Sequence, residues 1–408
     1  MQRPMDYGSS FQLISASSVK TAALLRLLGA GMQVLFDEVG GTLGQILKHL
    51  QRVVLWRQRS YPIVGIYIYP VKSMAAVRVD CAKLDSYGFV HDRRFAVTSR
   101  DGKLLTQREC RRLAALQPQI SDDGFLRLSD IEHPEIGTAR VPLQAASAED
   151  ALLEVYPSPT AEWGGFTPLC LDCGDEVASW LTTAIDWPQM NDFPKYRLVK
   201  MAGDGTESYE SSPRRVRMAS SQHWAEAYTD DSKLAFQDSS PILIASMASL
   251  AELNRRLQKD EKEPVPIHRF RPNLVIEAED AFAEDWWSKL RLQGPRLRGG
   301  LPLQVAKPCQ RCVVTTKPQA EGRSSDNALP ASPSSMLAEP LRTLKKFRLL
   351  RKGQDKKFGT SPCFGVNAAM IDPRKADGAE ICVGNTLLVE SWARESLLTT
   401  ENLWAVLR

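Results

Sequence analysis

The chain has 408 residues, of which 43% are hydrophobic and 25% are charged, and it carries a formal net charge of +4. This length predicts two or three soluble domains, each able to bury a core. So small a net charge argues against a nucleic acid or a strongly acidic molecule as partner. Eight cysteines are too few for a disulfide scaffold and indicate a reducing compartment.

The first 60 residues are predicted to form an N-terminal targeting or amphipathic segment. Residues 21–36 are apolar but contain Arg26 and Gln33, and they are shorter than the roughly 20 residues of a spanning helix. Residues 43–57 place apolar side chains at helical spacing with basic residues mainly on the other face. Such a helix could lie on a membrane surface through residues 20–57, act as a targeting signal, or pack on the protein.

Residues 61–200 show short β-type segments separated by Gly, Pro and Asp. These segments are IVGIYIY (63–69), RRFAVT (93–98), FLRLS (125–129) and LLEVY (152–156). Many short strands with such breaks predict a barrel-like N-terminal domain. A helix is expected at about 175–185, with Val177, Trp180, Leu181 and Ala184 on one face and Pro188 after its end.

Residues 201–235 are polar and irregular and are interpreted as a linker loop before a second block at 236–393. That block begins with PILIAS (241–246) and a helix with Leu250, Leu253 and Leu257 inward. Further strands are expected at NLVIEA (273–278), LPLQVA (301–306), CVVTT (312–316) and TLLVES (386–391). Residues 324–338 are Ser/Pro/Ala-rich and predict a flexible insertion, and 394–408 form a tail. The chain is therefore expected to be α+β and β-rich.

Four cysteines form two C-x-x-C pairs, Cys170/Cys173 and Cys309/Cys312. The first could be redox-active, could bind zinc, or could be structural, but the second pair lies far beyond the spacing of about 15–20 residues of a zinc ribbon. Cys312 opens a β-branched segment beside Arg311, and a nearby cation favours the thiolate that binds soft transition metals. A buried strand cysteine is the alternative.

Four fragments have the composition of an anion site. They contain Lys72 and Ser73; Asp92, Arg93 and Arg94; Asp238, Ser239 and Ser240; and Arg269, Arg271 and Asn273. Arginine gives two-pronged hydrogen bonds to phosphate, and lysine gives a point charge. Each fragment alone also fits a surface ion pair, and spacing does not show that the four converge.

Taken together, the motifs resemble the MOSC superfamily, and most closely the mitochondrial amidoxime-reducing component and its bacterial relatives. The resemblance covers roughly residues 61–393. Its most specific parts are PCQRCVVTT (308–316), EPLRTLKKFR (339–348) and FGTSPCFGVN (358–367). The fragments IYPVKS, DRRF, SSPILI (239–244, directly after Asp238) and RFRPNLVI follow the order of the family. The implied fold is an N-terminal β-barrel-like domain followed by a C-terminal MOSC β-barrel with helices packed around it.

The resemblance implies a molybdenum–molybdopterin cofactor and a role for each matching residue. Cys312 would bind molybdenum beside the two dithiolene sulfurs of the pterin, and of the second cysteine pair it alone would be a ligand. The phosphate or pterin contacts would come from Lys72, Ser73 and Arg93, and the pocket would be completed by Ser239, Ser240, Arg271 and Asn273. Asn367 falls where relatives place a cofactor contact, and Asp238 is a candidate for proton handling.

The implied activity is reduction of N-hydroxylated compounds such as amidoximes, with electrons from a cytochrome b5-type protein and its reductase. No G-x-G-x-x-G dinucleotide fingerprint is evident. The implied location is the mitochondrial outer membrane, with the cytoplasm as alternative. Two other functions stay open: a carrier or sulfur-transfer module, although no pyridoxal-phosphate desulfurase half is apparent, and a cofactor-free interaction protein. The chain departs from the family at Lys317-Pro318-Gln319, where relatives often have an acidic Asp-Pro turn, and at the 324–338 insertion.

Overall fold

The computed structural model describes residues 59–143, 152–155, 169–189, 193–201, 214–215, 233–319, 338–350 and 360–393. The described residues from Ser60 onward belong to one compact unit. The N-terminal segment, the 324–338 insertion and the 394–408 tail fall almost entirely outside the described residues. Within the described ranges, no helix is both long enough and apolar enough to cross a membrane.

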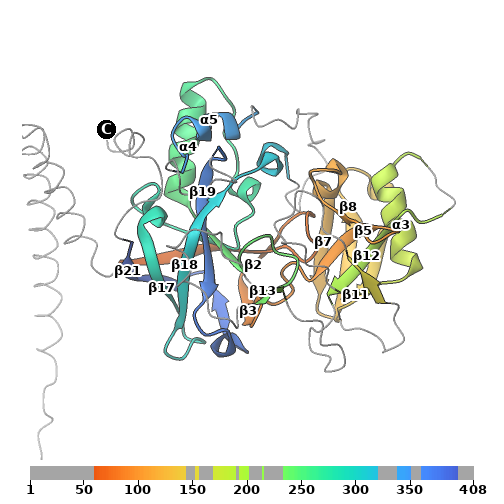
Figure 1. Cartoon of the computed structure of the whole chain (residues 1–408), viewed down its shortest axis with the longest axis horizontal. Helices are drawn as coiled ribbons and strands as arrows, with labels where there is room; N and C mark the ends of the chain where they lie inside the picture. The colour runs from red at the N-terminus through yellow and green to blue at the C-terminus, as the bar shows by residue number, and fades with distance from the viewer. Residues whose placement is uncertain are drawn as a thin grey trace, which may run out of the picture. The chain divides into compact units, whose positions relative to one another are not determined.

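Among the described residues, seven strands close into a barrel, in the order β16-β15-β19-β18-β17-β21-β1, with β1 pairing back onto β16. Strands β17, β18, β19 and β21 of this barrel are labelled in Figure 1. Their bounds are β1 (Ser60–Ile68), β15 (Ile242–Ser246), β16 (Leu274–Ile276), β17 (Trp287–Gln293), β18 (Leu301–Gln310), β19 (Cys363–Met370) and β21 (Thr386–Trp392). Alternate apolar side chains such as Ile66, Leu290 and Val366 fill the interior. Closure leaves none of these strands as an open edge, which removes a template for aggregation.

Strand β1 completes this barrel although it lies at the opposite end of the sequence from most of its partners. On one edge, residues Ser60–Pro62 pair antiparallel with β21. On the other edge, residues 63–66 pair antiparallel with β16, with a register shift between Ile63 and Gly65. The barrel therefore draws one strand from the segment that we had assigned to the N-terminal domain.

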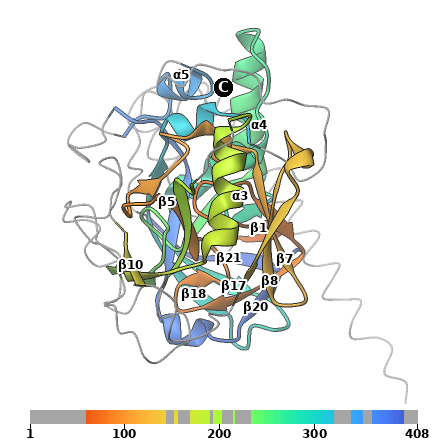
Figure 2. The ribbon, with the colours of Figure 1, turned by 90° about the vertical axis from the view of Figure 1, so that its right-hand side faces the viewer.

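Two smaller sheets and a helix form the rest of the N-terminal region (Figure 2). One sheet has the order β10 (Leu152–Glu154), β11 (Leu169–Asp172), β12 (Tyr196–Met201), β5 (Phe95–Ser99) and β6 (Leu104–Leu105). The other consists of β7 (Leu116–Ser121), β8 (Phe125–Asp130) and β9 (Thr138–Pro142). Both pack with α3 (Asp175–Asp186) around a shared core that contains Phe95, Leu126 and Leu181.

The remaining elements are short or lie outside the barrel. The helices are α4 (Met247–Lys259) and α5 (Leu341–Lys345), and the strands are β2 (Val77–Val79), β3 (Cys81–Asp85), β4 (Gly88–Phe89), β13 (Arg214–Arg215), β14 (Lys233–Leu234) and β20 (Glu380–Cys382). Six 3-10 turns complete the described elements: η1 (Arg111–Ala114), η2 (Pro134–Ile136), η3 (Ile267–Phe270), η4 (Ala283–Trp286), η5 (Val313–Thr316) and η6 (Pro373–Ala376). The predicted linker loop thus contains the small β13–β14 ladder.

The predicted β-rich α+β fold is confirmed, and the helix expected at 175–185 is α3, which ends at Asp186 before Pro188. The strand predicted at 312–316 is wrong. Strand β18 ends at Gln310, and residues Val313–Thr316 form the 3-10 turn η5. The hydroxyls of Thr315 and Thr316 donate to the carbonyl oxygens three residues before them, so local hydrogen bonds prevail over the strand preference of this β-branched run.

A disulfide joins Cys81 on β3 to Cys382 on β20, two residues that face each other across an antiparallel pair. We did not predict it, and it disagrees with the reducing compartment inferred from the cysteine count. The two cysteines are separated by 301 residues, so no local spacing in the sequence points to their pairing. The other six cysteines are free thiols.

Candidate functional site

A cavity of about 210 Å³ brings all ten predicted site residues together. They are Lys72, Ser73, Arg93, Asp238, Ser239, Ser240, Arg271, Asn273, Cys312 and Asn367. The lining also contains residues that we had not assigned to the site: Thr106, Arg108, Phe236, Gln237, Leu243, Phe270, Lys307, Cys309, Gln310, Arg311, Val314 and Ser361. Among the described residues that line the cavity, six are Lys or Arg and one, Asp238, is a carboxylate, so the cavity favours an anion.

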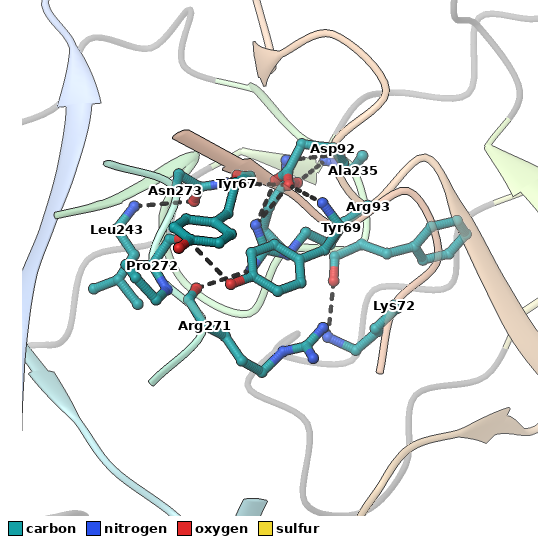
Figure 3. A network of polar contacts seen from close by, with 12 residues as sticks. Tyr67, Tyr69, Lys72, Asp92, Arg93, Ala235, Leu243, Arg271, Pro272 and Asn273 are labelled. Carbon is teal, nitrogen blue, oxygen red and sulfur yellow. Dashed lines mark hydrogen bonds and ion pairs between the residues drawn. The ribbon is translucent and has the colours of Figure 1, made fainter. Parts of the chain in front are cut away.

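The buried carboxylate of Asp92 organises one wall of the cavity (Figure 3). Its Oδ1 accepts the backbone N–H of Tyr69 at 2.9 Å and the side-chain amide of Asn273 at 3.1 Å. Nη1 of Arg93 donates to both of its oxygens, at 2.7 and 2.6 Å. Asp92 therefore ties the end of β1 to two residues of the predicted site.

Tyr69 lies under both arginines of the predicted phosphate site. The guanidinium carbon of Arg93 is 4.0 Å from the centroid of the tyrosine ring, and that of Arg271 is 4.3 Å from it. The hydroxyl donates to the carbonyl of Pro272 at 3.1 Å, and burial raises the pKa of Tyr69 above its ordinary value. Burial, together with the nearby charge of Arg93, lowers the pKa of Arg271 to about 10. Two cations thus lie against one tyrosine ring, an arrangement that a bound anion would stabilise.

Three of the predicted site residues have left-handed backbone conformations. The φ angles are 69° at Ser73, 51° at Arg93 and 54° at Arg271. Residues other than glycine adopt this region at a cost of about 1–3 kcal/mol, and such residues cluster at functional sites. Hydrogen bonds keep two of these residues in the strained conformation. The N–H of Arg93 donates to the carbonyl of Tyr69, and the N–H of Arg271 donates to the carbonyl of His268.

On another wall, Lys72 connects the end of β1 to the loop before β15. Its Nζ donates to the carbonyl of Phe236 at 2.8 Å and to Oδ1 of Asp238 at 2.5 Å. The lysine side chain is 8% exposed, whereas that of Asp238 is 53% exposed. Asp238 can therefore exchange protons with water while its other side faces a buried cation.

The serine and asparagine residues of the predicted site join the same loop to the barrel. The hydroxyl of Ser240 donates to the carbonyl of Ala368 at 2.6 Å, and the amide of Asn367 donates to the hydroxyl of Ser239 at 3.3 Å. Oδ1 of Asn273 accepts the N–H of Leu243 at 3.1 Å. These bonds fix the ends of β15, β16 and β19 at the cavity.

Cys312 lies at the start of η5, where the chain leaves β18. Its carbonyl accepts the N–H of Thr315 at 3.1 Å and the threonine hydroxyl at 2.9 Å, which fixes the turn. The half-buried thiol lines the cavity and is 3.5 Å from Nη2 of Arg108, a residue of the N-terminal region. The cation next to Cys312 is therefore Arg108, whereas the sequence had suggested the adjacent Arg311.

Arg311 instead contacts Cys309. Its Nη1 is 2.8 Å from the sulfur of Cys309, and its Nη2 donates to the carbonyl of Phe270 at 2.7 Å. Its buried Nε has no hydrogen-bond partner among the described residues. Cys309, whose direction the sequence left open, also lines the cavity, so both cysteines of the second pair reach it.

The other C-x-x-C pair lies at the end of β11, in the N-terminal region. Cys170 is buried, and burial raises the pKa of its thiol, while Cys173 is half-buried. Among the described residues, no group of three or more His, Cys, Asp or Glu side chains is placed to hold a metal ion. The role of this pair stays a prediction.

Sequence reasoning gave no role to Asp92 and missed Arg108 entirely. Asp92 was noted within the DRRF motif, but only its neighbour Arg93 was assigned a contact to the cofactor. Arg108 follows β6 in a short turn with no composition that marks an anion site. Only the packing of the N-terminal sheets against the barrel brings its guanidinium to Cys312.

Two families match adjacent parts of the chain: MOSC N-terminal beta barrel domain over residues 60–188 and MOSC domain over residues 231–387. The chain is 29% identical to mitochondrial amidoxime-reducing component 1 of Homo sapiens over 325 residues, which cover 78% of this chain and 80% of the relative. It is 27% identical to the molybdenum cofactor sulfurase of Drosophila melanogaster, over 79% of this chain and 35% of that protein.

Among solved structures, the YUAD protein of Bacillus subtilis matches 81% of the chain with 9% identity and a TM-score of 0.29, too low to support an argument. The assignment rests on the two family matches, on the closed barrel and on the relatives that align over most of the chain. The chain is a MOSC protein, in which a MOSC N-terminal beta barrel domain is followed by a MOSC domain.

Proposed function

We propose that the cavity binds a molybdenum–pterin cofactor and that the protein reduces N-hydroxylated compounds. The observation that carries this proposal is one cavity whose described lining residues include two thiols, six cationic side chains and a single carboxylate. The relatives named amidoxime-reducing components support the reaction, and the relative named molybdenum cofactor sulfurase supports the cofactor.

The residues present fit such a group. A phosphate dianion needs several charge-assisted hydrogen bonds, and Lys72, Arg93 and Arg271 line one cavity close to Tyr69 and Asp92. Soft metals prefer sulfur ligands, and the thiol of Cys312 lines the same cavity.

When bound, the cofactor would supply the two electrons that, with two protons, convert N–OH into N–H and water. The chain would contribute position and protons. Cys312 would hold the metal at the start of η5, whose hydrogen bonds fix its direction. Asp238 would pass protons from water at its exposed carboxylate, and Lys72 keeps that carboxylate beside the cavity.

We further propose that electrons come from a cytochrome b5-type protein and its reductase, and that the protein acts at mitochondria. The relatives are named mitochondrial components, which supports the location. The sequence shows no dinucleotide fingerprint of its own, which favours a separate electron donor.

The test is metal analysis of the purified full chain, expressed where the cofactor is made, together with an assay of benzamidoxime reduction by a chemically reduced electron donor. We expect about one molybdenum per chain and turnover that is lost in Cys312→Ser. Stoichiometric zinc without molybdenum, or an absence of both metals, would contradict the cofactor assignment. Molybdenum without N-reduction would leave the cofactor and remove the proposed reaction.

One observation favours a second function, the transfer of sulfur or cofactor. Cys309 lines the cavity beside Cys312 and contacts Arg311, so a second thiol is available to carry sulfur. The sulfurase relative is matched over only about a third of its length, and the rest of that protein has no counterpart here. A sulfur carrier would lose its function in Cys309→Ser, whereas the reductase would keep substantial turnover.

A further inference from the structure

Arg108 lies beside the proposed metal ligand yet comes from the N-terminal region of the chain. Its Nη2 is 3.5 Å from Sγ of Cys312, and its side chain lines the cavity. The three cations near Asp92 and Asp238, namely Lys72, Arg93 and Arg271, lie on other walls. Arg108 is thus the cation that contacts the sulfur at the proposed reaction centre.

A set of hydrogen bonds between the two halves of the chain holds this arginine in place. The amides of Gln107 and Gln319 pair reciprocally, each donating Nε2 to Oε1 of the other at 2.8 Å. Nζ of Lys317 donates to the carbonyl of Gln107. We call Gln107, Lys317 and Gln319 the glutamine clamp. All three side chains are buried, so these bonds are shielded from water.

The glutamine clamp also reaches the proposed phosphate site. Nε2 of Gln107 donates to the carbonyl of Ser73 at 2.7 Å, and Nη1 of Arg271 donates to Oε1 of Gln319 at 3.2 Å. The turn that carries Arg108 is closed by Thr106, whose carbonyl accepts the N–H of Cys110 at 2.8 Å. Arg108 is therefore fixed relative both to Cys312 and to the cofactor-binding residues.

Lys317 and Gln319 belong to the segment that directly follows η5, the turn that begins at Cys312. The lysine brings a buried positive charge toward the turn at Gln107, and the glutamine supplies the amide that pairs with it. The segment after η5 thus supports the turn that carries Arg108.

We propose that Arg108 binds the oxygen atom of the ligand that enters beside Cys312, with the glutamine clamp as its positioning device. This inference rests on the proposed function, in which that oxygen is the hydroxyl oxygen of the N–OH group. A guanidinium offers planar N–H donors and stays protonated, so it stabilises an oxygen that gains negative charge without giving up a proton. The preferred substrates are therefore small N-hydroxylated compounds whose oxygen is anionic or becomes so, such as hydroxamates and amidoximes.

The first experiment needs no cofactor. In the full chain expressed without cofactor synthesis, Cys312 is alkylated with anionic iodoacetate or with neutral iodoacetamide, and the rates are read by peptide mass spectrometry. Both rates depend in the same way on the fraction of Cys312 that is thiolate. Their ratio is therefore independent of that fraction and reports the local positive charge. Arg108→Gln should lower the iodoacetate-to-iodoacetamide ratio at Cys312 about 10-fold. The ratio at Cys309, which contacts Arg311, should stay unchanged and serves as internal control.

The second experiment uses the loaded enzyme. Arg108→Gln should keep its molybdenum content and lower kcat/KM for an N-hydroxylated substrate about 10- to 100-fold, as expected for the loss of one charged hydrogen bond. Arg108→Lys should recover part of that loss. Arg127→Gln, which removes an exposed arginine of β8 that does not line the cavity, should match the unmodified chain in both experiments. Gln319→Ala should lower the alkylation ratio in part, even if Arg108→Gln does not fold.

The outcomes separate this inference from the proposed function. An unchanged alkylation ratio in Arg108→Gln and in Gln319→Ala would overturn the role of Arg108, whatever the turnover. A lower ratio with unchanged kcat/KM would also overturn it and would leave the reductase assignment intact. Loss of molybdenum from Arg108→Gln would make the residue a cofactor ligand instead. If the unmodified, molybdenum-loaded chain reduces no N-hydroxylated compound, the proposed function fails, and the alkylation ratio still decides whether Arg108 recognises an anionic ligand.

Discussion

Replacing Asp92 by Asn tests whether the buried carboxylate organises the cavity. The side chain is fully buried, and that of its partner Arg93 is 12% exposed. Asparagine keeps the shape but removes the charge, and its amide presents N–H groups where the carboxylate accepted four hydrogen bonds. Breaking a buried ion pair at one partner costs about 3–5 kcal/mol, because the other charge remains buried without compensation.

The assay is urea unfolding of the cofactor-free chain, so that ligand binding does not add to the free energy of unfolding. We expect Asp92→Asn to lower that free energy by about 3–5 kcal/mol and to reduce molybdenum content in the loaded protein. Asp123→Asn is the control, because Asp123 also forms ion pairs with arginine, namely Arg127 and Arg140, but lies at the surface. A loss below about 1 kcal/mol in Asp92→Asn, or equal losses in both variants, would refute the reasoning.

Three further predictions concern a ligand, a buried acid and the disulfide. Cys312→Ser should abolish turnover per bound molybdenum while Cys309→Ser keeps substantial turnover; equal loss in both would reject Cys312 as the sole ligand. Burial and the charge of Asp285 raise the pKa of Glu284 from 4.5 to about 7, so the free energy of unfolding should fall as pH rises between these values. Glu284→Gln should remove this dependence and stabilise the protein at pH 8 by on the order of 3 kcal/mol, measured by urea unfolding across pH. The Cys81–Cys382 disulfide closes a loop of 301 residues, so reducing it should lower the free energy of unfolding by about 5–6 kcal/mol, the value that loop-closure entropy gives. An unchanged urea midpoint after reduction would contradict this prediction.

The sequence predicted the fold class and ten of the residues that line the cavity, for different reasons, but not the other twelve. Strand and helix positions follow from local patterns, as at α3, where apolar spacing and Pro188 set the helix and its end. The ten site residues were found through motifs and a family resemblance, and no spacing in the sequence could show that they meet. Their convergence depends on strands as distant in sequence as β1 and β19.

Features that depend on tertiary contacts were not predictable. Arg108 reaches Cys312 only because the glutamine clamp joins the turn after β6 to the segment after η5. The disulfide depends on the pairing of β3 with β20. The wrong strand prediction at residues 313–316 had a local cause instead. The composition of this run favours a strand, but the two threonine hydroxyls donate to backbone carbonyls and stabilise a turn.

The closure of the barrel by β1 has a consequence for biosynthesis. During translation, Ser60–Ile68 leaves the ribosome hundreds of residues before β21, its neighbour in the finished barrel. The nascent chain must therefore keep an apolar strand from premature pairing until Thr386–Trp392 emerges, which favours chaperone binding to the N-terminal region. An expression fragment that began at residue 231, where the match to the MOSC domain starts, would lack this strand and would expose β16 and β21 as edges.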